Sequence, residues 1–134
     1  MRRFFLSLLV LACSVWLVDR AQSAPPTTGS VNAVGGSGIS GKVSLHSTKD
    51  GTRVQLRLSG LQPDIEYIAV TSATTACDVG TAPPQPSDVL GRFRGDKKGT
   101  ASLTATVTTT LDQIHSVAVQ LGDGLTLVAC APLP

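Results

Sequence analysis

Aromatic residues and histidine are scarce in this sequence. Its 134 residues include one Trp, one Tyr and three Phe, and only Tyr67 and Phe93 lie beyond the first 23 residues. The core of the folded domain must therefore be built mainly from aliphatic side chains. The two histidines, His46 and His115, are far apart in sequence and have no third partner, which argues against a metal site built on imidazoles. We interpret both as surface or strand-end residues.

No excess of charge of either sign remains once the N-terminal segment is set aside. Three of the 11 Lys and Arg residues lie within residues 1–23, as does one of the 9 Asp and Glu residues, so the remainder carries equal numbers of each. A neutral domain gives no electrostatic argument for binding nucleic acid or an anionic membrane. We therefore expect neither as a partner.

The N-terminal segment has the layout of a secretory signal. Arg2 and Arg3 supply positive charge, residues 4–18 form an apolar stretch, and residues 21–23 (Ala-Gln-Ser) form a small-x-small cleavage site. The apolar stretch is shorter than the roughly 20 residues that a membrane span needs. We expect a signal peptide over residues 1–23, a secreted or periplasmic location, and no transmembrane segment after cleavage.

The same segment contains an alternative. Residues 10–13 (Val-Leu-Ala-Cys) resemble a bacterial lipobox, in which Cys13 would carry a lipid anchor and hold the protein in the cell envelope. The apolar stretch continues past this cysteine as far as Val18. That layout favours soluble export over lipid anchoring.

Cleavage after residue 23 would leave two cysteines, Cys77 and Cys130. An even number in an oxidising compartment is typical of disulfide bonding, and two cysteines permit a single intramolecular pair. Closing the segment between them would stabilise the fold by about 4 kcal/mol on the chain-entropy model. That is a large share of a small domain's stability. We predict a structural Cys77–Cys130 disulfide.

The rest of the chain shows the periodicity of strands. Residues 24–37 are rich in Gly, Pro, Ser and Thr, so we expect a flexible leader with at most a short edge strand at residues 31–34. In residues 38–134, short runs of alternating apolar and polar residues are separated by turn residues, and nothing resembles a helix. Predicted strands cover 41–46, 53–58, 65–72, 89–94, 100–110, 114–121 and 125–130. Regular spacing of this kind predicts an all-β antiparallel sandwich or barrel.

The strand at residues 65–72 is central to this arrangement. Ile68 and Val70 are predicted to face the core, with Tyr67, Ala69 and Thr71 on the opposite face. A turn containing Gly60 and Pro63 precedes it, and Cys77 follows it.

Three blocks of sequence, in this order, resemble the copper/zinc superoxide dismutase family. Residues 58–63 (LSGLQP) are similar to its G-L-x-P turn, residues 90–101 (LGRFRGDKKGTA) to its L-G-N-V-T-A-D-x-x-G-x-A segment, and residues 128–130 (VAC) to its terminal L-A-C. The blocks and the cysteines keep the family's order over about residues 38–131. The resemblance implies a Greek-key β-sandwich or barrel over residues 38–134.

The metal ligands of that family do not carry over. The two copper histidines of its central strand align with Ala69 and Thr71, and its late copper histidine aligns with Gln120. A methyl group cannot bind a metal. The region of its zinc loop, residues 78–89, has no histidine, and Asp88 lies beside the position of the family's zinc aspartate. The comparison therefore implies a domain without copper, zinc or another cofactor.

A small basic cluster is formed by Arg92, Arg94, Lys97 and Lys98. It would suit contact with an anionic surface, such as a polysaccharide or a lipid headgroup. The ordinary explanation is a strand edge that is protected by charge.

Three hypotheses follow. The leading one is a secreted or envelope-associated, non-catalytic superoxide-dismutase-like domain with a structural or binding role and no identified partner. The second is a divergent copper/zinc superoxide dismutase that uses His46, His115 and Asp88 as ligands. The third is an unrelated immunoglobulin-like module for adhesion or envelope assembly.

Overall fold

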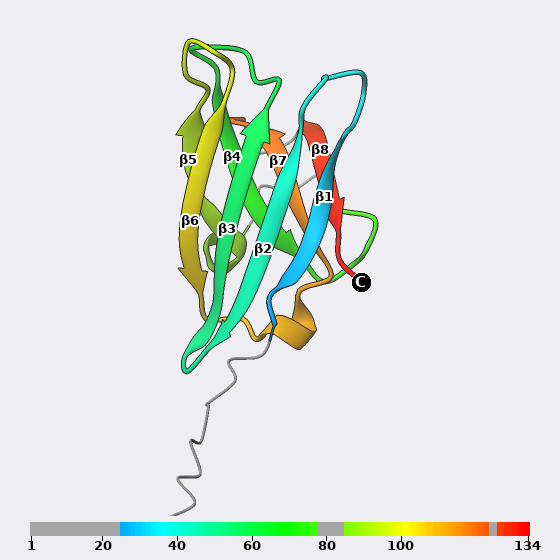
Figure 1. Cartoon of the computed structure of the whole chain (residues 1–134), viewed down its shortest axis with the longest axis vertical. Helices are drawn as coiled ribbons and strands as arrows, with labels where there is room; N and C mark the ends of the chain where they lie inside the picture. The colour runs from blue at the N-terminus through cyan, green and yellow to red at the C-terminus, as the bar shows by residue number, and fades with distance from the viewer. Residues whose placement is uncertain (1–24, 78–84, 124–125) are drawn as a thin grey trace, which may run out of the picture.

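One antiparallel sheet makes up the fold and curls into a nearly closed barrel (Figure 1). The computed structural model describes residues 25–77, 85–123 and 126–134. Its strands are β1 (Thr27–Ala33), β2 (Ser40–Thr48), β3 (Gly51–Ser59), β4 (Glu66–Ser72), β5 (Val89–Arg94), β6 (Ala101–Val107), β7 (Ser116–Leu121) and β8 (Leu127–Pro132). Within this part of the chain the helices are two short 3-10 turns, η1 (Pro86–Asp88) and η2 (Leu111–Gln113). The predicted all-β class is confirmed.

The strands run in the order β5-β4-β7-β8-β1-β2-β3-β6. Figure 1 shows β6, β3, β2 and β1 nearest the viewer, which we call the front sheet, and β5, β4, β7 and β8 behind them, which we call the back sheet. The chain crosses between the sheets after β3, after β5 and after β6. Strands β5 and β6 end the order on either side, so a seam without strand pairing lies between them.

Strand β1 corrects the predicted leader at residues 24–37. Residues 27–31 pair with β2, and residues 32–33 pair with β8, so β1 joins the two sheets and is not an edge strand. The glycine content of this segment suggested a linker, but Gly29 is needed for close packing. A Cβ at this position would lie 3.0 Å from Leu133 Cδ2 and 3.0 Å from the Pro132 carbonyl oxygen. Pairing on both sides outweighs the weak strand preference of these residues.

The hairpin of β2 and β3 forms as its alternation predicts. Thr48 lies opposite Gly51 across a tight turn at Lys49 and Asp50, and the pairing continues without a shift to Ser40 opposite Ser59. Every second residue points inward. The inward residues of the hairpin that belong to the core are Val43, Leu45, Val54, Leu56 and Leu58, each less than 5% exposed.

Strand β4 is buried on both faces, and its predicted orientation is reversed. Tyr67 and Ala69 belong to the main core, whereas Ile68 and Val70 belong to a second cluster on the outer side of the back sheet. Apolar residues occupy both parities of this strand, so alternation alone could not select the inner face. Tyr67 is fixed inside by stacking on Phe93, with ring centroids 5.8 Å apart.

Among the described residues, no helix has the length and apolar character needed to cross a membrane.

The position of β1 predicts that filling the space at Gly29 destabilises the protein. Gly29→Val should lower the free energy of unfolding by about 1–3 kcal/mol, because the new side chain overpacks the contact with Leu133. Ser30→Val, at the exposed neighbouring position, is the control and should have little effect. Urea denaturation measures both. Equal stability of the two variants would contradict the placement of β1 inside the sheet.

Candidate functional site

The Cys77–Cys130 disulfide is present, as predicted. It joins the segment after β4 to strand β8, with the two Cα atoms 5.9 Å apart. Cys77 is 1% exposed and packs with Ile68, Val70 and Ala118 in the second cluster. The bond therefore holds a cover over the outer face of the back sheet. The predicted signal peptide and Cys13 lie outside the described residues.

The three positions aligned with copper ligands do not face one another. Ala69 and Thr71 point to the inner side of β4, where they pair with Val119 and Val117 of β7. Gln120 pairs with Ile68 and therefore points to the outer side. A methyl group, a hydroxyl and an amide divided between two faces of a sheet do not suit copper, which prefers imidazole or sulfur ligands that converge.

Gln120 is nevertheless unusual, because its side chain is completely buried and neither polar atom is satisfied. Its exposed fraction is 0%, and among the described residues neither Nε2 nor Oε1 has a hydrogen-bond partner. Burying an amide without a partner is costly. The neighbours on its face are apolar, since Ile68 lies opposite it on β4 and Leu127 lies opposite it on β8.

The candidate ligands of a divergent metal site lie on separate elements. His46 is on the outer side of β2 opposite Arg53, and His115 lies between η2 and β7. Asp88 ends η1, and its backbone carbonyl accepts a hydrogen bond from Thr71 Oγ1 at 3.4 Å. No group of three or more His, Cys, Asp or Glu side chains in the described ranges is arranged to hold a metal ion.

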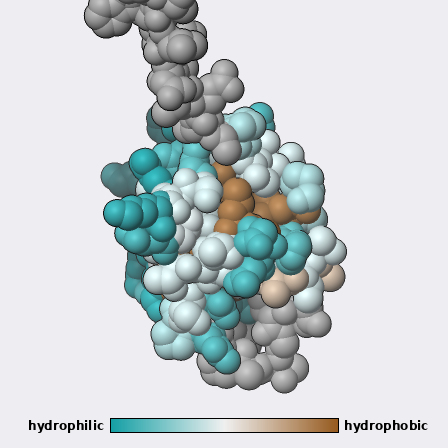
Figure 2. Space-filling model, turned by 90° about the horizontal axis from the view of Figure 1, so that it is seen from below, coloured by the Kyte–Doolittle hydropathy of each residue, from teal (hydrophilic) through white to brown (hydrophobic). Residues whose placement is uncertain are grey.

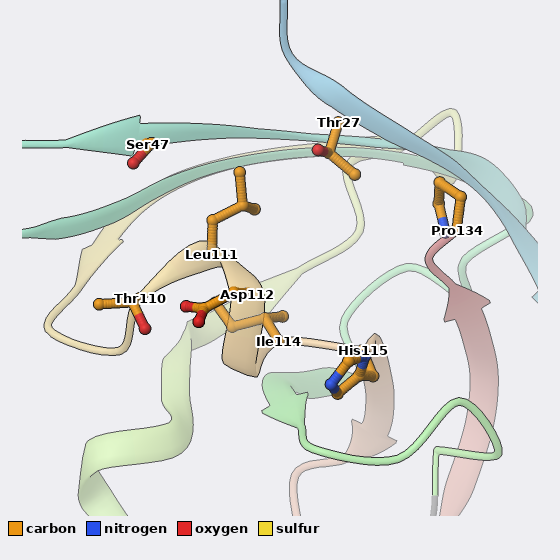
Figure 3. A pocket seen from close by; sticks show the side chains of 8 residues that line it. All are labelled: Thr27, Ser47, Thr110, Leu111, Asp112, Ile114, His115 and Pro134. Atoms are coloured by element: carbon orange, nitrogen blue, oxygen red, sulfur yellow. The ribbon is translucent and has the colours of Figure 1, made fainter. Parts of the chain in front are cut away.

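A pocket of about 460 Å³ opens at the lower end of the barrel. Figure 2, a view from below, shows apolar atoms exposed between hydrophilic side chains at this end. Figure 3 shows the lining, in which Asp112 and His115 come from the connection between β6 and β7. The other lining residues are Thr27, Ser47, Thr110, Leu111, Ile114 and Pro134.

The polar groups of this pocket do not form a catalytic arrangement. In the part of the chain that the structure describes, no hydrogen bond joins the side chains of Asp112 and His115, and neither side chain bonds to the Ser47 hydroxyl. An activated nucleophile needs a base within hydrogen-bonding reach and a third group that orients the base. The pocket therefore offers space and hydroxyl groups, and among the described residues none of these hydroxyls is hydrogen-bonded to Asp112 or His115.

The basic cluster at the edge of the back sheet is partly neutralised. Arg92 Nη1 lies 2.8 Å from Glu66 Oε1, and Arg94 Nη2 lies 3.7 Å from Glu66 Oε2. Each arginine also donates to a backbone carbonyl, Arg92 to Gly122 and Arg94 to Asp64. These contacts fit a strand edge protected by charge better than a free anion site.

Lys97 and Lys98, the other members of the basic cluster, lie in the turn between β5 and β6. Asp96 organises this turn by accepting hydrogen bonds from the hydroxyl and the backbone N–H of Thr100 and from the backbone N–H of Lys98. The bonds from Thr100 hold the pKa of the Asp96 carboxyl below its usual value, with a smaller contribution from Lys98. A carboxylate is therefore built into the same turn as the two lysines.

A second set of cations, which the sequence interpretation missed, lies on the front sheet. We call the three cations Lys42, Arg53 and Arg57, together with the neighbouring His46, the cationic face. Lys42 lies directly opposite Arg57, and His46 directly opposite Arg53, on the outer side of the β2–β3 hairpin. The sequence shows these basic residues at the polar positions of two alternating strands. Only the pairing of β2 with β3 shows that they lie side by side.

The disulfide predicts a large loss of stability when it is removed. Cys77→Ala/Cys130→Ala should lower the free energy of unfolding by about 4 kcal/mol, because the two cysteines are 53 residues apart and the bond restricts the unfolded chain. Guanidinium denaturation of the double variant and of the reduced wild-type protein provides the measurement. A loss below about 1 kcal/mol would show that the cover over the back sheet does not depend on the bond.

The unsatisfied amide predicts the opposite effect at Gln120. Gln120→Met keeps the approximate shape of the side chain and removes two buried polar atoms, so it should raise the free energy of unfolding by about 1–3 kcal/mol. Gln55→Met, at a half-exposed position of β3, is the matched control and should be close to neutral. Thermal denaturation compares the two. A destabilised Gln120→Met protein would mean that the amide makes a stabilising bond.

Comparison with known proteins adds no relative: no protein-family model matches the sequence, and no curated protein matches it.

Proposed function

We propose that this chain is an exported, non-catalytic domain with a superoxide-dismutase-like fold and a binding or structural role. The strand order supports the fold, because β4 pairs with β5, β6 follows β5 across the unpaired seam, and β3 lies beside β6. A Greek key has this relation between three consecutive strands and a fourth. The disulfide supports export, since such bonds persist in oxidising compartments.

The proposal depends chiefly on one observation, the division of the aligned copper positions between two faces. Ala69 and Thr71 lie against the core, and Gln120 lies on the other side of the sheet. A redox metal site requires several suitable ligands around a point that substrate can reach. Here two of the positions are packed inside and the third is fully buried, so these residues do not fit copper.

The alternatives have less support. A divergent enzyme would need His46, His115 and Asp88 to converge, and they lie on the front sheet, at the lower end of the barrel and beside the back sheet, respectively. An immunoglobulin-like sandwich places its second strand beside the fifth. Here β2 lies between β1 and β3, which favours a different topology.

The expected result of metal analysis is that the protein does not retain copper or zinc. After refolding with both metals and passage over a desalting column, it should carry far less than stoichiometric copper and show no dismutase activity. His46→Ala/His115→Ala should behave as the wild-type protein does. Stoichiometric, tightly held copper together with activity that the double variant loses would overturn the proposal in favour of a divergent enzyme.

A further inference from the structure

We propose that the outer face of the front sheet binds an anionic polysaccharide through the cationic face. The proposal gives a ligand class to the binding role proposed above and rests on that role. It concerns the front sheet, on the opposite side of the barrel from the back sheet, which carries the aligned copper positions and the disulfide. The strands that carry it, β1, β2, β3 and β6, face the viewer in Figure 1.

The register places the cations in a compact group. Lys42 and Arg57 are directly opposite each other, and His46 and Arg53 form a second pair on the same face. Side chains opposite each other in an antiparallel sheet have Cβ atoms about 5 Å apart. Four residues along a strand span about 13 Å, which is the separation of the two pairs. Lys42, Arg53 and Arg57 are all exposed.

This arrangement has a cost that folding alone does not explain. Like charges directly opposite each other destabilise a sheet. Proteins often place Lys or Arg on edge strands to prevent aggregation, but β2 and β3 are inner strands of the front sheet. Its edge strand, β6, presents the uncharged residues Ser102, Thr104 and Thr106 on this face. The positive charges therefore lie on inner strands of the sheet, where they are not needed to protect an edge strand from pairing with another chain.

Acidic residues do not neutralise this face. None of the outward residues of β1, β2, β3 and β6 is Asp or Glu. Within the described residues, Lys42, Arg53 and Arg57 form no ion pair, whereas both arginines of β5 pair with Glu66. A domain that is neutral as a whole thus carries unpaired positive charge on one broad surface, which attracts anions.

The uncharged residues of the face indicate what kind of anion fits. Hydroxyl and amide groups surround the cations, on all four strands. They are Thr28, Ser30, Ser44, Gln55, Ser102, Thr104 and Thr106. Such groups can donate hydrogen bonds to the hydroxyls of a sugar chain and accept hydrogen bonds from them. The face has no aromatic side chain on which bases could stack, and no large apolar side chain that could enter a lipid layer. A sugar polymer with sulfate or carboxylate groups matches this chemistry.

Binding to heparin and to alginate, immobilised on separate sensor surfaces, tests the proposal and separates sulfate from carboxylate recognition. The wild-type protein should bind at least one of them and should not bind dextran, which is neutral. Arg53→Gln/Arg57→Gln should weaken binding by about fivefold for each cation removed, the scale expected for a Lys or Arg near an anionic surface. Higher salt should weaken the wild-type interaction.

Lys97→Gln/Lys98→Gln provides the matched control, because it removes the same charge from the turn between β5 and β6. It should bind as the wild-type protein does. Equal weakening of the two double variants would show attraction by net charge alone and overturn the proposal. So would a failure to bind both polymers, or tighter binding to phosphatidylglycerol vesicles or to a single-stranded oligonucleotide than to either polysaccharide.

A stability measurement separates binding from folding. Because Lys42 opposes Arg57, Lys42→Gln should slightly raise the denaturation midpoint while it weakens polysaccharide binding. Loss of both stability and binding would indicate that the residue supports the fold, and would contradict the proposed role. Dismutase activity is assayed separately on metal-treated protein, so a catalytic domain that binds no polysaccharide is distinguishable from a non-catalytic domain that binds none.

Discussion

Burial of strand β4 on both faces is the constraint on which the rest of this structure depends. Its inner residues pack in the barrel, and its outer residues, Ile68 and Val70, need a second cover. The disulfide between Cys77 and Cys130 holds that cover against β8, so it completes a layer of the core. A metal site on this strand would need polar ligands and an open position for substrate. The central residues Ile68, Ala69 and Val70, packed on both sides, carry no such ligand.

Hydrophobic periodicity in the sequence was sufficient to predict a strand and its inward face where one face of the strand is apolar and the other polar. The β2–β3 hairpin was predictable for that reason, since its apolar parity and its turn agree. Strand β4 was not, because I-A-V in its centre is apolar at both parities. The prediction of a leader in place of strand β1 was wrong for a different reason. Gly29 resembles a linker residue in the sequence, and only the contact with Leu133 shows that a small residue is required there.

The cationic face could not be predicted from the total charge of the domain. Equal numbers of acidic and basic residues beyond residue 23 suggested a surface without a preference for anions, but a total says nothing about where the charges lie. Arg92 and Arg94 belong to a basic cluster that was predicted because its residues are close in sequence. Glu66, from a strand that is distant in sequence, partly neutralises both arginines. The cations of the cationic face come from two strands, and only the register shows that Lys42 and Arg57 are neighbours.

The two sheets therefore differ in what their outer faces are free to do. The centre of the outer face of the back sheet is occupied by the apolar second cluster, so the residues of that cluster serve stability. The described part of the chain places no such cover on the outer face of the front sheet. Its strands alternate exposed polar residues with buried apolar ones, and only the buried residues contribute to the core. Substitutions on that outer face cost little in folding, because its side chains contact mainly solvent. The repulsive pair of Lys42 and Arg57 lies at such a position, and an anionic ligand would remove the repulsion when it binds.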